Sequence, residues 1–341
     1  MTWARTMPER PVIAVAGATG AVGREMLNVL EQRAFPAARV LAYASSRSAG
    51  RRVPFGGAEL VVEEMTPASF AGVDIALFSA SASVSKEMRE AVVGAGCVMI
   101  DNSSAFRMED DVPLVVPEVN PGDVSRHSGV IANPNCSTIQ MVVALKPLAD
   151  LAPMTRVVAS TYQAASGAGQ AAMDELYAQT ADFLAGRELR PEKFAHRIAF
   201  NCIPHIDVFL GDGSTKEEWK MVVETKKIMH MPDLAVTATC ARVPVLRCHS
   251  EALNVEFAAP VGVETARAAL AAAPGIIVLD DPAAKLYPMP ALLEGTDATY
   301  VGRLRADTSV EHGLALWVVA DQLRKGAALN AVQIAEALLG R

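Results

Sequence analysis

Residues 11–23 read PVIAVAGATGAVG, and this stretch decides the fold of the first part of the chain. Its apolar start, Pro11–Ala16, predicts a buried strand, and the apolar spacing over residues 26–30 predicts a helix behind it. The glycine-rich loop between the two allows a tight turn. It also lets a pyrophosphate approach the backbone at a helix N-terminus, which favours negative charge. We therefore expect a dinucleotide site formed by Gly17, Thr19, Gly20, Ala21, Val22 and Gly23.

The alternation of strand and helix continues beyond this loop. Arg39–Ala44, Val73–Phe78 and Cys97–Ile100 are predicted strands, and Ser85–Ala95 is a predicted helix. Buried apolar strands that alternate with helices indicate parallel βαβ units. The sequence thus predicts an α/β fold whose N-terminal domain, residues 1–135, is a Rossmann-type doubly wound parallel sheet.

The pattern changes after Cys136. Several strands now alternate polar and apolar residues, which is typical of an antiparallel sheet in an α+β domain. We expect this second domain to span residues 136–319 and to bind substrate and mediate dimerisation. A last helix, Asn330–Leu339, is predicted to pack back onto the first domain, so that residues from about 320 to 341 join it. The predicted strands of the second domain are Val157–Thr161, Ala235–Val245, Glu251–Ala258, Ile276–Leu279, Tyr300–Leu304 and Leu314–Val319, and its helices are Ala171–Leu184, Glu217–Met229 and Glu264–Ala272.

The end of the second predicted strand indicates which dinucleotide binds. A site for NAD places an acidic residue there, against the ribose 2′-hydroxyl. This chain has Ser45, Ser46, Arg47 and Ser48 instead, whose hydroxyls and guanidinium suit a 2′-phosphate. We therefore expect NADP as cofactor. The alternative is an ordinary solvated basic loop.

Composition excludes several classes of protein. The 341 residues carry a net charge of −7, which argues against nucleic acid as the main partner. No apolar run is long enough for a membrane span, and the polar start, Met1–Arg10, is predicted as an extension that lacks the core of a signal peptide, with Met7 an alternative start. Five scattered cysteines show no metal-binding spacing, so we expect no metal site, no disulfide framework and a cytoplasmic location.

One cysteine stands apart from the other four. Cys136 lies in Asn133-Pro134-Asn135-Cys136-Ser137-Thr138, a helix-start pattern that precedes an apolar run. A helix N-terminus stabilises a thiolate, which is the reactive form. A packed, unreactive cysteine at a helix end is the alternative.

Further candidates follow in the second domain. Arg242 and His249 flank the end of a predicted strand, and Gln163 precedes the small-residue loop of Ser166 and Gly167. Glu217 and Lys220 are three apart on a predicted helix, a spacing that usually forms a solvated ion pair.

The motifs GATGAVG, SSRSAG, DNSSAFRM, NPNCST, YQAASGAG, KEEWK and RVPVLRCHS, in this order, resemble the aspartate-β-semialdehyde dehydrogenase family. The resemblance covers nearly the whole chain, from about Val12 to the final helix. It implies a homodimeric, NADP-dependent phosphorylating aldehyde dehydrogenase. Such an enzyme converts L-4-aspartyl phosphate to L-aspartate 4-semialdehyde in the biosynthesis of lysine, threonine, methionine and isoleucine.

The resemblance also assigns roles to residues. It implies that Cys136 is the nucleophile that forms a thioester, that His249 is the acid/base, and that Arg242 binds the substrate α-carboxylate. Gln163 and Asn135 would help to hold the substrate, and Glu217, with Glu218 as its adjacent alternative, would meet the α-ammonium. Phosphate would be bound by Arg107 and Lys220, and the nicotinamide amide would lie near Gln322, Ser166 and Gly167.

Two other functions stay open at this point. An N-acetylglutamyl-phosphate reductase shares the nucleotide loop and the Cys/His chemistry, but its acetylated nitrogen carries no charge for Glu217 to meet. A non-catalytic NADP-sensing protein shares only the nucleotide loop. It gives no role to Cys136, Arg242 or His249.

Overall fold

The structure is a computed structural model that describes residues 6–341. The first five residues of the predicted N-terminal extension therefore lie outside the described part. The chain forms two compact units. The first comprises residues up to Asn135 together with Ala327–Arg341, and the second is Cys136–Gly326. The chain returns to the first unit at Ala327, rather than at about 320.

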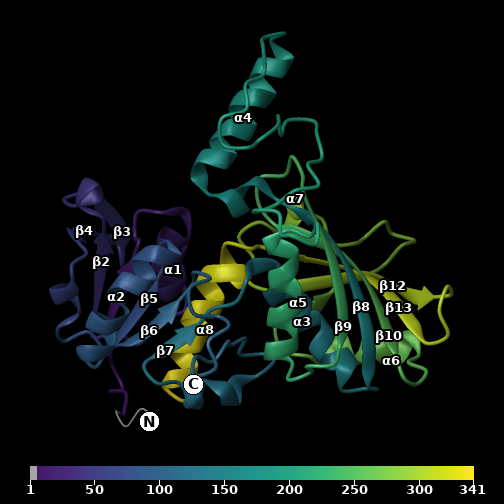
Figure 1. Ribbon diagram of the computed structural model, residues 1–341, viewed down its shortest axis with the longest axis horizontal. Helices are drawn as coiled ribbons and strands as arrows, with labels where there is room; N and C mark the ends of the chain where they lie inside the picture. Colours follow the sequence, from purple (N-terminus) through teal and green to yellow (C-terminus); the bar gives the residue numbers. More distant parts are fainter. Residues whose placement is uncertain (1–5) are drawn as a thin grey trace. The chain divides into compact units, whose positions relative to one another are not determined.

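The first unit is built on a sheet of seven strands within residues 6–341, in the order β3-β4-β2-β1-β5-β6-β7. All neighbours are parallel except β3 and β4, which form an antiparallel hairpin at one edge. Figure 1 shows this sheet with its helices. The strands are β1 (Val12–Ala16), β2 (Arg39–Ala44), β3 (Arg52–Phe55), β4 (Ala58–Glu64), β5 (Ile75–Phe78), β6 (Val98–Asp101) and β7 (Val130–Ala132), and the helices are α1 (Ala21–Gln32) and α2 (Ala82–Gly94).

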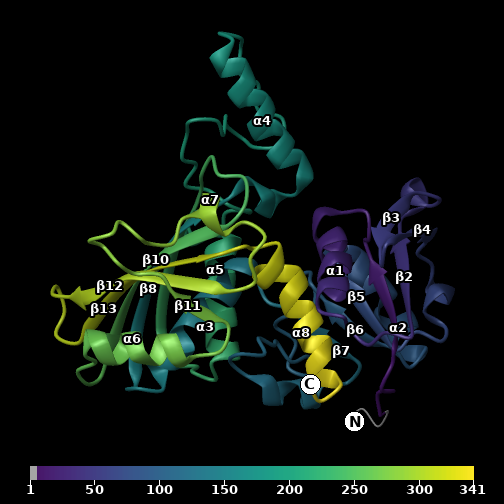
Figure 2. The same ribbon diagram turned by 180° about the vertical axis from the view of Figure 1, so that it is seen from behind.

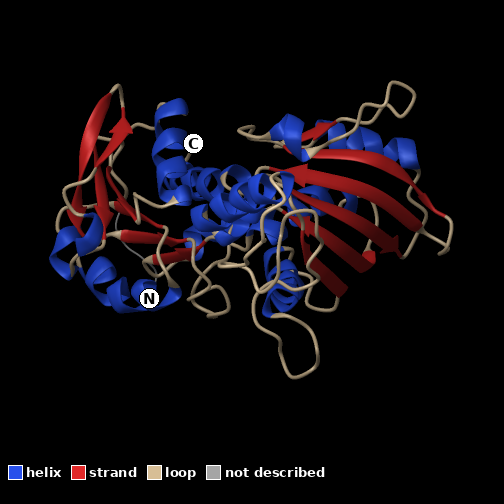
Figure 3. Cartoon of the chain, turned by 90° about the horizontal axis from the view of Figure 1, so that it is seen from above, coloured by secondary structure: helices blue, strands red, loops and turns tan. Residues whose placement is uncertain are grey.

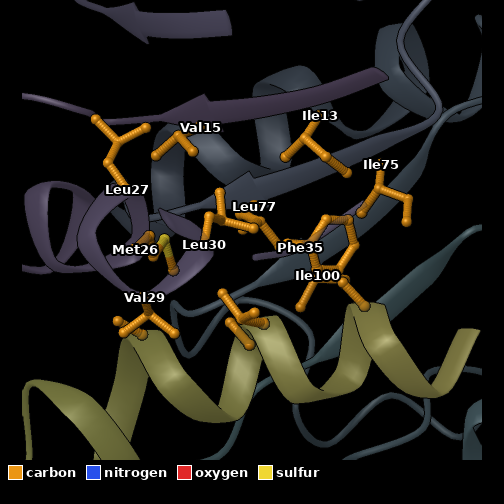
Figure 4. Close-up of a cluster of buried hydrophobic side chains, with 14 of the residues drawn as sticks. Ile13, Val15, Met26, Leu27, Val29, Leu30, Phe35, Ile75, Leu77 and Ile100 are labelled. Atoms are coloured by element: carbon orange, nitrogen blue, oxygen red, sulfur yellow. The ribbon is translucent and has the colours of Figure 1, made fainter. Parts of the chain in front are cut away.

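The last helix, α8 (Leu329–Leu338), completes the core of the first unit. Its apolar face packs with α1, β5 and β6, and Figure 4 shows α8 in yellow next to Val29 and Ile100. Asn330 anchors this helix, because its amide donates to the carbonyl of Val115 at 2.9 Å and to Asn133 Oδ1 at 2.7 Å. Two buried hydrogen bonds therefore fix the final helix to chain segments far away in sequence.

The second unit is built on a sheet of six strands, counted over the described residues, in the order β11-β12-β13-β10-β8-β9. Helices α3, α5 and α6 pack on one of its faces (Figures 1 and 2), and Figure 3 shows the twisted fan of its strands. The strands are β8 (Met154–Gln163), β9 (Ala235–Arg242), β10 (His249–Phe257), β11 (Ile276–Val278), β12 (Thr299–Asp307) and β13 (Gly313–Ala320), and the helices are α3 (Cys136–Ala149), α4 (Gln170–Leu184), α5 (Lys216–Ile228), α6 (Val263–Ala272) and α7 (Pro290–Leu293).

The predicted fold class is confirmed: a Rossmann-like parallel sheet is followed by a mixed sheet. Three of the five strand pairs in the second sheet are antiparallel, and the pairs β8–β9 and β11–β12 are parallel. The edge hairpin β3–β4 was not predicted, because its strands are largely exposed and carry no continuous apolar run. Strand β9 ends at Arg242 rather than at Val245, and Pro244, which has no N–H to donate, follows shortly after.

A π-helix, Arg324–Ala328, precedes α8 and contains the boundary between the two units. Such irregular turns often mark functional positions. Among residues 6–341, no helix has the length and apolar character that crossing a bilayer requires.

Candidate active site

Three predicted site residues lie in one row across the second sheet. Gln163 pairs with Arg242 in the parallel β8–β9 register. Ser250 pairs with Tyr162 in the antiparallel β10–β8 register, which places His249 opposite Gln163. Because residues in register on neighbouring strands share a face, all three side chains lie on the helix-covered side. We call Arg242, Gln163 and His249 the catalytic row.

Cys136 is the first residue of α3, as the sequence predicted, and is half-buried. The next residue fixes this helix start to the sheet, because Gln163 Nε2 donates to Ser137 Oγ at 2.7 Å. On its other side Cys136 meets the π-helix: a Cβ added to Gly326 would lie 2.9 Å from Cys136 Cβ. Cys136 is thus held between the catalytic row and a backbone that tolerates no side chain.

His249 is completely buried, and its two ring nitrogens have different surroundings. Nδ1 accepts a hydrogen bond from the backbone N–H of Ala164 at 3.0 Å. Nε2 has no hydrogen-bond partner among the atoms of residues 6–341. Burial, and secondly the charge of Arg242, lower the pKa of His249 well below its ordinary value, so the ring is neutral at neutral pH. Since Nδ1 is an acceptor, the proton of the neutral ring is on Nε2, which becomes a donor.

Arg242 is almost fully buried, and its Nη1 donates to the carbonyl of Ala164 at 2.7 Å. Burial lowers the pKa of Arg242, whereas the nearby Glu217 and Cys136 raise it. Guanidinium groups stay protonated in proteins, so Arg242 presents a fixed positive charge. Gly167 lies directly against it: an added Cβ there would be 2.7 Å from Nη1 and 3.1 Å from His249 Nε2.

Helix α5 adds a buried group of charges. Glu217 Oε1 accepts from Gln163 Nε2 at 3.2 Å, and Lys220 Nζ donates to Glu217 Oε2 at 2.9 Å and to Asp207 Oδ2 at 2.7 Å. The side chains of Lys220 and Glu217 are only 12% and 6% exposed, so the pair is not the solvated helix face that its spacing suggests. Burial lowers the pKa of Lys220, but Glu217 and Asp207 raise it by more, so the ammonium stays charged.

The structure separates Glu217 from its neighbour Glu218. Glu218 caps α5 by accepting from the backbone N–H of Thr215 at 2.7 Å and also accepts from the N–H of Cys240 at 3.0 Å. Glu217 is therefore the carboxylate that reaches the catalytic row. Asp207 was missed by the sequence analysis, because no motif marks it and only the fold brings it to Lys220.

The loop of Ser166 and Gly167 is tied to the segment that follows β13. Gln322 Nε2 donates to Ser166 Oγ, and Gln322 Oε1 accepts from the backbone N–H of Cys248 at 2.8 Å. Cys248 has a φ of 70°, an uncommon value for a residue other than glycine, directly before His249. Gln322 thus fixes the position of Ser166 and of the turn at Cys248 that orients His249.

The remaining predicted residues lie in the first unit. Arg107 is buried and its Nη2 donates to the carbonyl of Asn102 at 2.9 Å, and Asn135 is buried at the end of the unit. The predicted 2′-phosphate loop, Ser45–Ser48, follows β2 and exposes Arg47. Thr19 Oγ1 lies 3.4 Å from Ser48 Oγ, which joins this loop to the glycine-rich loop.

The glycine-rich loop has the close backbone packing that a nucleotide cradle needs. Gly17 has a φ of 84°, and a Cβ there would lie 2.1 Å from the carbonyl oxygen of Ser79. A Cβ on Gly23 would lie 2.1 Å from the carbonyl oxygen of Gly17. Helix α1 begins directly after Gly20, so its first N–H groups point into the loop. No group of three His, Cys, Asp or Glu side chains within residues 6–341 could hold a metal ion.

Two family models match the chain. Residues 12–127 match the semialdehyde dehydrogenase NAD binding domain, and residues 145–325 match the semialdehyde dehydrogenase dimerisation domain. The aspartate-semialdehyde dehydrogenase of Aquifex aeolicus is 55% identical over 331 residues, which cover 96% of this chain and 97% of that protein. The Bacillus subtilis enzyme is 52% identical, with 96% of each chain covered. The chain belongs to the aspartate-semialdehyde dehydrogenase family.

Solved structures of the aspartate-semialdehyde dehydrogenase family agree with this assignment. Aspartate semialdehyde dehydrogenase II of Vibrio cholerae, complexed with ASA, matches with a TM-score of 0.95 and 46% identity, covering 97% of this chain and 98% of that one. The enzyme of Candida albicans with NADP matches with a TM-score of 0.76 and 28% identity, covering 96% and 98%. The resemblance found from the sequence motifs is therefore confirmed.

Gly326 offers a direct test of how tightly Cys136 is held. Replacing Gly326 by Ala puts a methyl group against Cys136 Cα and Cβ, and overpacking of this kind costs about 1–3 kcal/mol. We expect Gly326→Ala to lower both kcat and the rate of Cys136 alkylation by about tenfold or more. The matched control is Gly94→Ala, because a Cβ at Gly94 meets no atom within 4 Å. Unchanged alkylation in Gly326→Ala would show that Cys136 is free to move away from the π-helix.

Proposed function

We propose that the chain catalyses the NADPH-dependent reductive dephosphorylation of L-4-aspartyl phosphate to L-aspartate 4-semialdehyde, a step in the biosynthesis of lysine, threonine, methionine and isoleucine. The observation that carries this proposal is the catalytic row beside Cys136. A nucleophilic cysteine at a helix start, a buried guanidinium and a buried neutral imidazole lie within one unit. The Gln163 side chain contacts Ser137 beside the cysteine, and the Ala164 backbone contacts both Arg242 and His249. These groups suit acyl transfer to sulfur from a substrate that carries a carboxylate.

Substrate binding is assigned to the charges around Gln163. The planar guanidinium of Arg242 can grip the α-carboxylate with two parallel hydrogen bonds. Glu217, which Lys220 and Gln163 orient, suits the α-ammonium. This pairing supports a free amino acid over N-acetylglutamyl phosphate, whose acylated nitrogen is neutral.

Cys136 then attacks the acyl phosphate carbon, the bond from this carbon to the phosphate oxygen breaks, and a thioester remains. When bound, NADPH supplies the hydride that reduces this thioester. Expulsion of the Cys136 thiolate from the reduced carbon releases the aldehyde. At each tetrahedral stage the negative charge falls on the former carbonyl oxygen, which needs a donor.

His249 supplies that donor in our proposal. Because its Nδ1 accepts from Ala164, the free Nε2–H can donate to the developing oxyanion. This donor role differs from the general acid/base role expected for His249 from the sequence. To take up a proton the ring must become an imidazolium, which burial and the charge of Arg242 both oppose. Hydrogen bonding, rather than full proton transfer, is the role that these contacts favour.

The remaining predicted residues are assigned to phosphate and cofactor. Arg107 and Lys220 are the proposed phosphate ligands, and Asn135 precedes the nucleophile. NADP is proposed to bind at Gly17, Thr19, Gly20, Ala21, Val22 and Gly23, with its 2′-phosphate at Ser45–Ser48. The glycine packing described above fits the tight turn of a pyrophosphate-binding loop, because a Cβ on Gly17 or Gly23 would collide with neighbouring backbone. Ser166, Gly167 and Gln322 are proposed to lie at the nicotinamide.

The second sheet also supports a homodimer. The face of the sheet opposite α3, α5 and α6 exposes Tyr162, whose ring lies 5.3 Å from that of Trp317, beside a hollow of about 380 Å³ lined by Tyr287 and Met289. Aromatic and Met side chains are enriched at protein interfaces. We propose that a second copy covers this face, and that the enzyme works in the cytoplasm, since a reducing compartment suits a catalytic thiol.

The reaction is tested in the oxidative direction with NADP, phosphate and a panel of semialdehydes. We expect phosphate-dependent NADP reduction with aspartate semialdehyde and little with N-acetylglutamate semialdehyde. Cys136→Ser is expected to lower turnover at least about a thousandfold while NADP binding persists, because a serine hydroxyl is a far weaker nucleophile. Full activity in Cys136→Ser would exclude the thioester mechanism. If the wild type binds NADP but shows no turnover, a non-catalytic NADP-sensing function would be favoured.

Arg47 tests the choice of cofactor. Losing a charge-assisted hydrogen bond to a 2′-phosphate costs about 1.5–3 kcal/mol, so Arg47→Ala should reduce the preference for NADP over NAD by about ten- to a hundredfold. The change is expected in the KM for NADP, measured beside the KM for NAD. Arg10→Ala, also exposed in the first unit, serves as the control. A wild type that prefers NAD would show that Ser45–Ser48 do not face the 2′ position.

Lys220 tests the phosphate site. We expect Lys220→Ala to raise the KM for phosphate by about tenfold or more, and the KM for aspartate semialdehyde by less, because one cation of the anion site is lost. Both KM values are measured in the oxidative direction. Lys226→Ala, further along the same helix, is the control. A larger effect on the semialdehyde would mean that Lys220 acts only by orienting Glu217.

A further inference from the structure

A second polar layer lies directly beneath the catalytic row. Alternate residues of a strand share a face, so Cys240, Thr161 and Glu251 follow Arg242, Gln163 and His249 on the helix-covered side. The register confirms this row, because Glu251 pairs with Thr161 and Thr161 with Cys240. All three residues are buried.

Helix α3 covers this layer with another polar side chain. Gln140 is completely buried and lies one turn beyond Cys136 on the same helix. Its amide is close enough to the Glu251 carboxyl to influence the ionisation of that group by hydrogen bonding. The two side chains do not meet the distance and angle limits of a hydrogen bond. The amide oxygen and nitrogen of Gln140 and the two carboxyl oxygens of Glu251 have no other hydrogen-bond partner within residues 6–341. Each of the two side chains is therefore an available partner for the other.

Within residues 6–341, no cation is found to balance a negative charge on Glu251. The groups that face it are Gln140 from α3, Thr161 from β8, Val318 from β13 and, at longer range, the carboxylate of Glu217 from α5. Burial raises the pKa of Glu251 well above its usual range, Gln140 lowers it in part, and Glu217 raises it further. The carboxyl is consequently a neutral acid at neutral pH.

We propose that Glu251 is a positioning residue whose neutral carboxyl pairs with the Gln140 amide and so joins the strand of His249 to the helix of Cys136. A neutral acid and a primary amide complement each other: the acid O–H donates to the amide oxygen, and the amide N–H donates to the acid carbonyl. A carboxylate has no donor, so it would leave the amide oxygen of Gln140 unsatisfied.

Neutrality also matters for the nucleophile. A negative charge one layer below Cys136 would disfavour its thiolate and would favour protonation of His249. Both changes would oppose thioester chemistry, so the role rests on the proposed function. The paired layer supplies polar contacts that fix α3 on β10 without adding charge beneath the reacting groups.

The test compares Glu251→Leu with Glu251→Gln. Losing the pair in Glu251→Leu should lower kcat by about tenfold, with the KM for the semialdehyde changed by less than about threefold. Glu251→Gln keeps a neutral hydrogen-bonding group and should recover most of this loss. Glu256→Leu and Glu256→Gln are the matched controls, because Glu256 is on the same strand but forms an ion pair with Arg156 outside the layer.

The second readout is the pKa of the Cys136 thiol, obtained from the pH dependence of iodoacetamide alkylation of the peptide that carries Cys136. We expect the same thiol pKa in wild type and Glu251→Gln. Gln140→Glu, which adds a carboxyl to the layer, should raise it by about one unit, and the exchanged pair Gln140→Glu with Glu251→Gln should restore it.

Any of three results would overturn the proposal. They are a full kcat in Glu251→Leu, an equal loss of kcat in Glu251→Leu and Glu251→Gln, and a thiol pKa that falls by about a unit in Glu251→Gln. If Glu251→Leu does not fold, the double variant Gln140→Glu with Glu251→Gln decides. A thiol pKa in this double variant that stays as high as in Gln140→Glu alone would overturn the proposal. Alkylation requires no substrate. A wild type without turnover would therefore count against the proposed function, while the alkylation results would still decide the role of Glu251.

Discussion

The register of β8 against β9 and β10 is the constraint on which the second unit depends. It places Gln163 between Arg242 and His249, and the Gln163 side chain then reaches Ser137 on α3 and Glu217 on α5. Because side chains alternate between the two faces of a strand, a slip of one residue would move Gln163 to the opposite face. Gln163 would then no longer share one side of the sheet with the guanidinium of Arg242 and the imidazole of His249, and it would lose its contact with Ser137.

The charges around Gln163, of which only that of Asp207 is exposed, are balanced before any substrate enters. Arg242 and Lys220 contribute two positive charges, and Glu217 and Asp207 contribute two negative ones. His249 adds none, since its ring is neutral. A zwitterionic amino acid places an ammonium and a carboxylate in such a site without changing its net charge. Buried ions are costly unless paired, so this balance explains how a polar pocket is compatible with a folded core.

Local patterns were sufficient to predict much of this molecule. The glycine-rich loop, most of the inner strands and the start of α3 at Cys136 follow from periodicity and helix-start signals close together in sequence. The edge hairpin β3–β4 did not, because its strands are mostly exposed. Asp207, Gly326 and the Gln140–Glu251 layer were also beyond reach. Their significance comes from contacts between residues far apart in the chain, and a single sequence gives no register for those contacts.

The helix α8 has a consequence for how the protein is made. Its apolar face completes the core of the first unit, although the whole second unit separates it from Asn135 in the sequence. During synthesis the N-terminal residues leave the ribosome long before this helix exists. The parallel sheet must therefore wait, with the surface that α8 will cover still exposed, until the second unit and then α8 have been synthesised. Such exposed apolar surface promotes aggregation, so completion of the first unit depends on prior synthesis of the second.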